Sequence, residues 1–329
     1  MKPVRGTAFA RAGLLGNPSD QYAGRAIALT FRDFGASVAL EPAERFEIVP
    51  GAADETCADD ARDAVARLRE EGCHGGVRLL QATLLRFAGA SGRFGALAQD
   101  DPRLRFRMRY ESDVPRQAGL SGSSAIIIAG LRALAAWFQE DLAAERIAQI
   151  ALAAEVEDLG IQAGPMDRVI QSWEGVLFMD FAGPDGERSR LDPGLLPALY
   201  VAWSPRPGLD SGLVHSDVRA RWLAGDPQVR EAIAAFPALA DEGRECLERG
   251  DVERLCALVD RNFDMRASIY KLGRADHEMV ALGRDHGAAV KLCGSGGSVL
   301  GVMPDASVWP RLERAYADAG YRALRPQVG

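Results

Sequence analysis

The chain has 329 residues, of which 47% are hydrophobic and 26% charged, and its formal net charge is −7. This length suggests two domains at roughly 100–200 residues each, and no apolar run approaches the ~20 residues that span a bilayer. The negative charge argues against a nucleic-acid partner, because phosphate backbones bind basic surfaces. The N-terminus lacks the apolar segment of a signal peptide, so we expect a cytoplasmic protein with no membrane partner. Five scattered cysteines form neither a disulfide framework nor a zinc pattern.

The N-terminal part mixes strand and helix patterns. Runs of alternating or continuous apolar residues predict strands at 5–15, 26–31, 36–40, 45–49, 104–110 and 175–181. Helical spacing of apolar residues predicts helices at 77–88 and 141–158, and the almost uniformly apolar run 125–138 predicts a buried helix. The polar segment 54–71, with spaced alanines, is compatible with the start of a solvent-facing helix. Glycine, proline and aspartate cluster between residues 183 and 194, which is turn chemistry. We therefore expect domains of residues 1–190 and 191–329.

The C-terminal part contains mostly helical patterns between a few strands. Strands are predicted at 199–203, 288–292 and 299–303. Helices are predicted at 211–224, 227–249, 251–272, 278–285 and 309–319. A glycine-rich loop follows Cys293 and separates the last two strands.

A glycine- and serine-rich loop, Pro115 to Ala125, joins a strand to an apolar helix. Gly119 and Gly122 permit positive φ, so successive N–H groups can point into one concavity. The helix that follows directs its positive dipole end toward this loop. The pattern predicts a phosphate site, and the alternative is an ordinary junction between a loop and a helix.

Two further patterns are candidates for a functional site. Glu155, Glu157 and Asp158 gather at a helix C-terminus, where acids oppose the helix dipole unless they have a partner. They are either a solvated face or the source of a metal ligand. Arg11 lies within an apolar strand pattern, where an arginine is usually paired or extends its head to solvent.

Several common active-site motifs are missing from the sequence. GxxxxGK[ST] and HRD do not occur, which excludes the P-loop and protein-kinase phosphoryl-transfer scaffolds. The loop after Gly119 is not GxSxG. The glycines after Cys293 lie between two strands rather than opening a βαβ unit, so they are not a dinucleotide loop.

Three ordered motifs resemble those of the GHMP small-molecule kinases: Arg11–Asp20, Pro115–Ala125 and Lys291–Gly297. Together they extend over nearly the whole chain. Within that superfamily the sequence most resembles glucuronokinases, on the basis of the segments 13–20, 119–125, 162–168, 175–181, 210–216 and 218–223. The resemblance implies an α+β GHMP kinase fold of two domains. The N-terminal domain would be like domain 2 of ribosomal protein S5, and the C-terminal domain would be ferredoxin-like.

The resemblance also implies ATP and Mg²⁺, with residue roles. The ATP phosphates would contact Pro115, Gly119, Leu120, Ser121, Gly122, Ser123, Ser124 and Ala125. Asp167 would be the catalytic base, and Arg11 would hold Asp167 ionised or contact the transferring phosphoryl group. Glu155 and Ser124 would bind Mg²⁺. Glu157 is the competing acid, and the choice among serines 121, 123 and 124 stays open because the loop is one residue longer than usual.

Sugar-binding residues are implied in the same way. Asp20 matches a position that binds sugar hydroxyls in the galactokinase branch, with Asn17 and Ser19 beside it. The loop Gly294, Ser295, Gly296 and Gly297 would close the site. Arg168 follows the base where Asn or Gln is common, and an arginine there could bind a uronate carboxylate bidentately.

The expected reaction is transfer of the ATP γ-phosphate to the anomeric hydroxyl of D-glucuronate, giving glucuronate 1-phosphate. Phosphoryl transfer needs mainly positioning and charge neutralisation, which these residue types can supply. One alternative is the same chemistry on another sugar or sugar acid, such as galacturonate. The other is a catalytically silent homologue that binds nucleotide or sugar.

Overall fold

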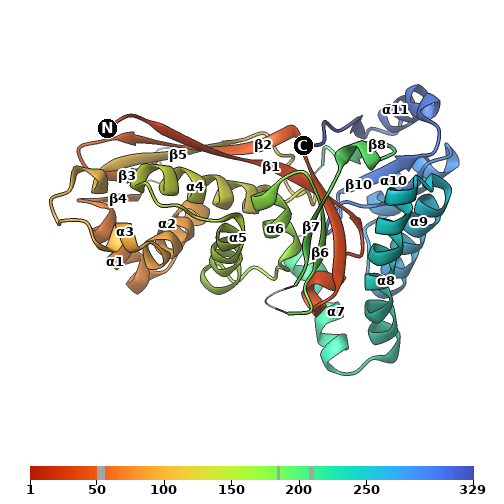
Figure 1. The fold of residues 1–329 in the computed structure, drawn as a ribbon, viewed down its shortest axis with the longest axis horizontal. Coiled ribbons are helices and arrows are strands. Elements are labelled where there is room, and N and C mark those ends of the chain that lie inside the picture. Colours follow the sequence, from red (N-terminus) through yellow and green to blue (C-terminus); the bar gives the residue numbers. More distant parts are fainter. Residues whose placement is uncertain (50–55, 184–185, 207–210) are drawn as a thin grey trace. The chain divides into compact units, whose positions relative to one another are not determined.

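The computed structural model describes residues 1–49, 56–183, 186–206 and 211–329 (Figure 1). The predicted turn at 183–186 and the segment that begins at Asp210 lie partly outside these residues. The chain forms two compact units, each built from separate segments. Unit 1 comprises residues 1–10, 34–114 and 122–173, and unit 2 comprises residues 11–33, 115–121 and 174–329. The division of the chain into domains 1–190 and 191–329 stays a prediction.

Unit 1 packs helices against strands. Its strands are β3 (Phe46–Ile48), β4 (Thr56–Ala58), β5 (Phe106–Ser112) and parts of β1 (Val4–Leu15) and β2 (Arg25–Pro42). Its helices are α1 (Ala61–Glu71), α2 (Arg78–Ala90), α3 (Gly92–Gly95), α4 (Gly122–Phe138), α5 (Ala144–Ala153) and α6 (Met166–Trp173). A short 3-10 helix, Pro102–Leu104, precedes β5, and a π-helical turn, Ala154–Asp158, follows α5.

The strand β2 differs from the sequence prediction of two strands at 26–31 and 36–40. It is continuous, and residues 36–42 pair antiparallel with β5 while residues 25–29 pair antiparallel with β6 (Val176–Asp180). Gly35 does not turn the chain. A Cβ at Gly35 would lie 2.9 Å from the carbonyl oxygen of Ala8, so this glycine permits close approach of β1. The prediction of two strands was therefore wrong, because the polar residues between them continue the same strand.

The core of unit 1 surrounds α4. Thirteen of the seventeen residues of α4 are buried, as its almost uniformly apolar sequence predicts. The helices α2 and α4 pack against each other, and both contribute to one hydrophobic cluster with β2, β3 and β5 (Figure 1). The polar residues at the start of α4 are thus attached to a rigid element.

Unit 2 contains a second sheet with its own helices. The strands of unit 2 include β6 and β7 (Arg188–Leu191), which belong to the first sheet. The second sheet consists of β8 (Ala198–Trp203), β9 (Ala289–Leu292), β10 (Ser298–Met303) and β11 (Arg322–Leu324). The helices of unit 2 are α7 (Ser211–Leu223), α8 (Pro227–Arg249), α9 (Val252–Ile269), α10 (Arg274–Asp285) and α11 (Trp309–Asp318). Short 3-10 helices cover Ser19–Tyr22, Pro193–Leu195 and Ala306–Val308.

The strand order of the second sheet is β11-β8-β10-β9, and all its pairs are antiparallel. Numbered along the chain, these strands run fourth, first, third and second, with helices after the first and after the third. This is the split βαβ arrangement of ferredoxin-like folds. The predicted ferredoxin-like C-terminal topology therefore occurs, and the described residues between β8 and β9 form four helices, α7 to α10, in place of one.

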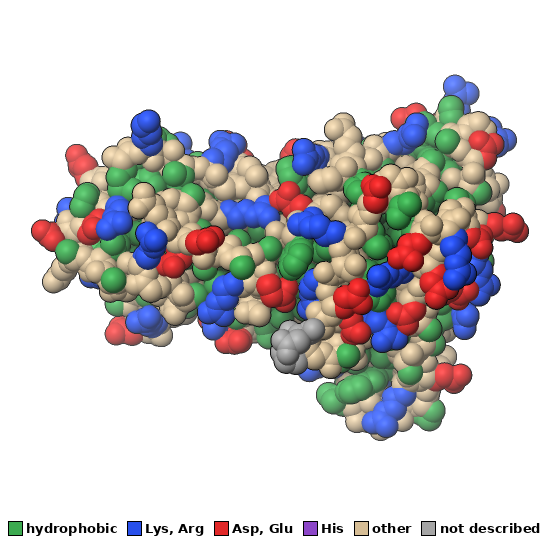
Figure 2. Space-filling view, viewed as in Figure 1, with side chains coloured by type: hydrophobic (Ala, Val, Ile, Leu, Met, Phe, Trp, Pro, Cys, Tyr) green, Lys and Arg blue, Asp and Glu red, His purple; other side chains and the backbone are tan. Residues whose placement is uncertain are grey.

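The antiparallel helices α8 and α9 form the surface beside this sheet (Figure 1). Acidic and basic side chains are interspersed over them in Figure 2. Some form ion pairs, such as Arg244 with Glu248 and Arg254 with Glu242. A core of residues from α9, α10, α11 and the four strands lies beneath.

Candidate functional site

Three segments that the sequence singles out meet in unit 2. The Arg11 guanidinium donates a hydrogen bond to the carbonyl oxygen of Gly119 at 2.6 Å. The N–H of Gly13 donates to the carbonyl oxygen of Cys293 at 2.8 Å. The hydroxyl of Ser298 donates to the carbonyl oxygen of Ala118 at 2.5 Å. The end of β1, the loop before α4 and the loop before β10 are therefore tied together.

Glycines allow these loops to touch backbone to backbone. A Cβ at Gly119 would lie 2.4 Å from the carbonyl oxygen of Gly296, and the φ of Gly119 is +65°. A Cβ at Gly294 would lie 2.7 Å from Nη2 of Arg11. Any larger residue at these positions meets backbone or a buried guanidinium, so both glycines are required by contact, and Gly119 by its backbone conformation as well.

The loop before α4 has alternating backbone handedness. Gln117, Gly119 and Ser121 have positive φ, of 54°, 65° and 63°. Left-handed residues at every second position of a loop are a feature of backbone nests, in which successive N–H groups point to one side and can bind an anion. Gly122, predicted to share this role, is the first residue of α4. Ser121 instead takes the left-handed conformation, which is uncommon for a non-glycine residue.

In unit 1, the side chain of Glu155 faces the first turn of α4. Its Oε1 accepts hydrogen bonds from the hydroxyls of Ser123 and Ser124, both at 3.0 Å, and its Oε2 lies 3.1 Å from the Ser124 hydroxyl. Glu155 and Ser124 are completely buried, whereas Ser123 is half-buried. The structure thus brings together the predicted metal ligands Glu155 and Ser124, with Ser123 as a second hydroxyl.

A π-helical turn explains how Glu155 reaches this position. Residues 154–158 widen the helix by one residue per turn, a rare feature that is common at functional sites. Glu155 then faces inward, and the next two acids face Arg86. The Arg86 guanidinium donates to Asp158 at 2.5 and 2.8 Å and pairs with Glu157 at 2.8 Å. Asp158 is therefore ion-paired, and Glu157 is engaged away from the serines.

Arg168 is engaged with acids of its own unit. Its Nε and Nη2 donate to Oε2 of Glu155, and its Nη1 donates to the carbonyl oxygen of Gly164 at 2.8 Å. Nη1 also lies 3.7 Å from Oδ2 of Asp167. The Arg168 and Glu155 side chains are 6% and 0% exposed, and that of Asp167 is 19% exposed. Arg168 therefore joins the two acids of the candidate site.

The donor set around Glu155 suits Mg²⁺ rather than a transition metal. It consists of one carboxylate and two hydroxyls, which are the hard oxygen ligands that Mg²⁺ prefers together with substrate phosphates. No group of three or more His, Cys, Asp and Glu side chains able to hold a metal occurs among the described residues. The residues fit an ion held largely by a bound phosphate, not an all-protein cage.

The predicted sugar-binding turn is held by two buried residues that the sequence analysis missed. Asn262 on α9 accepts a hydrogen bond from the Gly16 N–H at 2.8 Å and donates to the carbonyl oxygen of Asn17 at 3.2 Å. The ammonium of Lys291 donates to the carbonyl oxygen of Gly13 at 2.7 Å and to Oδ1 of Asn17 at 2.8 Å. Burial lowers the pKa of Lys291 well below its usual value. These contacts fix the turn.

The three predicted residues of this turn differ in exposure and partners. Asn17 is 3% exposed, and Lys291 engages its amide. Ser19 is fully buried, and its hydroxyl donates to the carbonyl oxygen of Arg25 at 3.0 Å. Asp20 is 8% exposed. Of the three, Asp20 is the most accessible to a sugar.

The second glycine-rich loop is held by α10. The carboxylate of Asp276 accepts hydrogen bonds from the N–H groups of Gly297 and Gly273, at 2.7 and 3.2 Å. Ser295 and Gly296 are half-buried, whereas Gly294 and Gly297 are buried. The loop therefore offers Ser295 and Gly296 to a ligand and uses Gly297 as an anchor.

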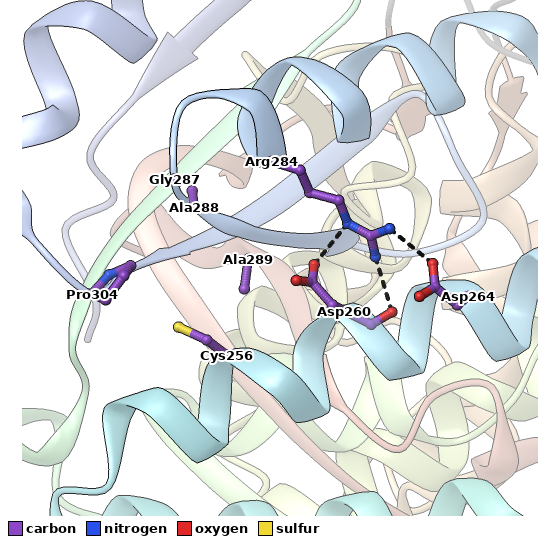
Figure 3. Close-up of a pocket in the computed structure, with 8 residues that line it drawn as sticks. All are labelled: Cys256, Asp260, Asp264, Arg284, Gly287, Ala288, Ala289 and Pro304. Carbon is purple, nitrogen blue, oxygen red and sulfur yellow. Dashed lines mark hydrogen bonds and ion pairs between the residues drawn. The ribbon is translucent and has the colours of Figure 1, made fainter.

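A cavity of about 370 Å³ lies elsewhere in unit 2, between α9, α10 and β9 (Figure 3). The Arg284 guanidinium contacts Asp260 Oδ1 at 2.8 Å and Asp264 Oδ1 at 2.9 Å. Burial raises the pKa of the Cys256 thiol to about 11, so this thiol is not ionised at neutral pH. The charged groups of the cavity are paired with one another, and we regard it as structural.

The fold, the loops joined around Arg11 and Gly119, and the polar group around Glu155 together define a GHMP-type small-molecule kinase. Residues 79–175 match the family model described as GHMP kinases N terminal domain. The crystal structure of mevalonate kinase from Methanococcus jannaschii superposes with a TM-score of 0.78 at 14% identity, covering 100% of this chain and 98% of that one. This confirms the predicted α+β fold.

Two plant proteins are similar along nearly the whole sequence. Glucuronokinase 1 of Arabidopsis thaliana is 39% identical over 334 residues, covering 97% of this chain and 90% of its own length. Probable glucuronokinase 2 of the same plant is 40% identical over 310 residues, covering 90% and 83%. The chain therefore belongs to the GHMP kinase family, and it is an ATP-dependent sugar kinase. No described helix is both long and apolar enough to cross a membrane.

Proposed function

We propose that this chain transfers the γ-phosphate of ATP to the anomeric hydroxyl of D-glucuronate. The observation that supports this substrate is the 39–40% identity to the two Arabidopsis glucuronokinases over at least 90% of the chain. The bond that forms joins the anomeric oxygen to the γ-phosphorus. The bond that breaks joins that phosphorus to the β–γ bridging oxygen, and ADP leaves.

The ATP phosphates bind along Pro115 to Ala125 in this proposal. The alternating handedness at residues 117, 119 and 121 supports it, because N–H groups gathered on one side attract anions. Arg11 stays fixed by its hydrogen bond to Gly119 and supplies a positive charge beside this loop. Preorganised charge of this kind stabilises a phosphoryl-transfer transition state without reorganisation.

Asp167 acts as the base that accepts the proton of the anomeric hydroxyl. Glu155, Ser124 and Ser123 hold Mg²⁺, which when bound neutralises phosphate charge. Their mutual hydrogen bonds support this assignment, because the oxygens already converge on one place.

Asp20 contacts sugar hydroxyls, with Asn17 and Ser19 shaping the turn that carries it. In the second loop, Ser295 and Gly296 contact the sugar, and Gly294 and Gly297 set the loop's conformation. The different exposure of these residues supports that division.

Arg168 has a positioning role in this proposal. Since its guanidinium is already bound to Glu155 and Gly164, a uronate carboxylate at Arg168 would have to replace an existing buried partner. We therefore assign to Arg168 the orientation of Glu155 and the partial neutralisation of Asp167. Loss of discrimination between glucuronate and glucose in Arg168→Ala, with Mg²⁺ dependence unchanged, would instead support the carboxylate role.

Measurement of ADP release tests the proposal over a panel of D-glucuronate, galacturonate, galactose and glucose. We expect kcat/KM for glucuronate to exceed the values for galactose and glucose by at least about tenfold, since a site that pairs with a carboxylate rejects sugars lacking one. A preference for galacturonate would support the same chemistry on another sugar acid. Absence of ADP release with every sugar would indicate a catalytically silent homologue.

A further inference from the structure

Arg266 on α9 is a buried cation whose hydrogen-bonding capacity is not filled in the described part of the chain. Only 2% of the residue is exposed. Its Nε and Nη2 have no hydrogen-bond partner among the described residues. Its guanidinium carbon lies 4.9 Å from the centroid of the Tyr270 ring. Such a contact offsets part of the lost hydration but supplies no hydrogen-bond acceptor.

Burial without a partner is costly for a charged group. Removing an ion from water costs several kcal/mol even after relaxation of its surroundings, and buried polar atoms are nearly always hydrogen-bonded. Burial also lowers the pKa of Arg266, although Tyr270, Asp276 and Asp20 oppose that shift. A residue that destabilises the free protein in this way calls for a ligand that compensates it.

The helix α9 directs Arg266 toward the turn that carries Asp20. Asn262 precedes Arg266 by four residues and so lies one turn earlier on the same helix face. Asn262 is bonded to Gly16 and Asn17 in that turn. The electrostatic neighbours of Arg266 include Asp20 and Arg11. Arg266 therefore lies beside the proposed sugar-binding turn and within the same unit.

The nearby acids do not neutralise Arg266 directly. Asp276 accepts backbone hydrogen bonds from Gly297 and Gly273, and it forms no ion pair with Arg266 in the described part of the chain. Asp20 is an electrostatic neighbour of Arg266, but the Nε and Nη2 atoms of Arg266 donate no hydrogen bond to it. An additional anion is therefore the missing partner.

We infer that Arg266 binds the carboxylate of the uronate substrate and thereby selects a sugar acid over a neutral sugar. This inference rests on the proposed function. A guanidinium can donate two parallel hydrogen bonds to a carboxylate, because both groups are planar and their atoms match in spacing. Sugar hydroxyls would contact Asp20, and the carboxylate would contact Arg266 on the adjacent helix face.

The decisive comparison uses D-glucuronate and its neutral amide, glucuronamide, which differ little in size. In the wild-type protein, kcat/KM should favour glucuronate. In Arg266→Met the ratio of the two values should fall by roughly 10- to 100-fold, because a hydrogen-bonded charge pair contributes about that much to discrimination. Arg266→Lys should lie between, since it keeps the charge and loses the bidentate geometry.

Thermal unfolding separates this role from a structural one. Arg266→Met should have an unchanged or higher Tm without ligand, because it removes a buried charge that has no partner. Glucuronate should raise the Tm of the wild type and not that of Arg266→Met. The matched control is Arg284→Met, which loses the ion pairs in Figure 3 and should lower the Tm while leaving the substrate ratio unchanged.

The outcomes distinguish this inference from the proposed function. If the wild type releases no ADP with glucuronate, the proposed function fails. If the wild type is active but the glucuronate to glucuronamide ratio is the same in Arg266→Met, the inference about Arg266 is wrong. A lower Tm or failure to fold of Arg266→Met would contradict the argument from burial. Arg266→Lys would then decide, and an unchanged ratio in that variant would overturn the inference.

Discussion

Arg168 and Glu155 form an ion pair whose side chains are 6% and 0% exposed. The same carboxylate accepts hydrogen bonds from Ser123 and Ser124 at the start of α4. The Glu155 carboxylate, which we predict to bind Mg²⁺, is therefore fixed in position by Arg168 and by the two serine hydroxyls.

Glu155→Gln should raise the Mg²⁺ concentration needed for half-maximal activity and lower the stability. The stability loss should be about 3–5 kcal/mol, because Arg168 would remain buried without its partner. Magnesium titrations and urea unfolding measure the two effects. Glu157→Gln is the control, since the Glu157 side chain is 61% exposed and pairs with Arg86 instead. Equal effects of the two substitutions would exclude Glu155 as the metal ligand.

Asp167→Asn should abolish most of the turnover while preserving ATP binding. Loss of a general base usually costs about 10²- to 10⁴-fold in rate, and an asparagine keeps the size of the side chain. Steady-state ADP release gives kcat, and calorimetry gives the Kd for ATP. Turnover close to that of the wild type would show that another group accepts the proton.

Gly119→Ala should destabilise the fold and weaken ATP binding. An alanine would adopt the left-handed conformation at a cost of about 1–2 kcal/mol, and its Cβ would also lie 2.4 Å from the Gly296 carbonyl oxygen. Gly250→Ala is matched in backbone, with φ +70°, but nothing lies within 4 Å of its Cβ. Urea unfolding should show the larger loss for Gly119→Ala. A loss no larger than that of Gly250→Ala would contradict the close packing of the two loops.

The Cys256 thiol should react slowly with alkylating agents at pH 8. Burial raises its pKa to about 11 from the ordinary 9.0, so only about one thiol in a thousand is ionised at pH 8. The reaction rate should rise about tenfold per pH unit up to the pKa. Labelling followed by mass spectrometry, with Cys256→Ser to identify the signal, measures the rate. Fast labelling at pH 8 would contradict the burial of this thiol.

The pKa of the Cys256 thiol is higher in the folded protein than in the unfolded chain. The thiol therefore contributes to the stability of the fold below pH 9, and that contribution is lost as the pH rises toward about 11.

Much of the fold and part of the site follow from the sequence. Periodicity predicted most of the strands and helices because their apolar faces repeat at the spacing of each element. It did not predict β4, which lies within the predicted helix 54–71, or the continuity of β2. The contacts of Arg11 with Gly119 and Gly294 agree with the order of the three motifs, which the family resemblance supplied.

Other features could not be derived from local patterns. The π-helical turn Ala154–Asp158 depends on one additional residue in the helix, and this leaves no signal in the spacing of apolar residues. Asn262 and Arg266 did carry a usable signal. They occupy positions of the buried face of α9 that the residues Leu255, Val259 and Ile269 otherwise fill. Polar residues on an apolar helix face require partners, and we overlooked them because arginine is usually exposed.

The identity of the phosphorylated product tests the central claim most directly. We expect incubation with ATP, Mg²⁺ and D-glucuronate to give a single new phosphate ester. Its ³¹P NMR signal should couple to the anomeric proton, which places the phosphate on carbon 1. A phosphate on any other carbon, or ATP consumption that does not depend on glucuronate, would contradict the proposed glucuronate 1-kinase activity.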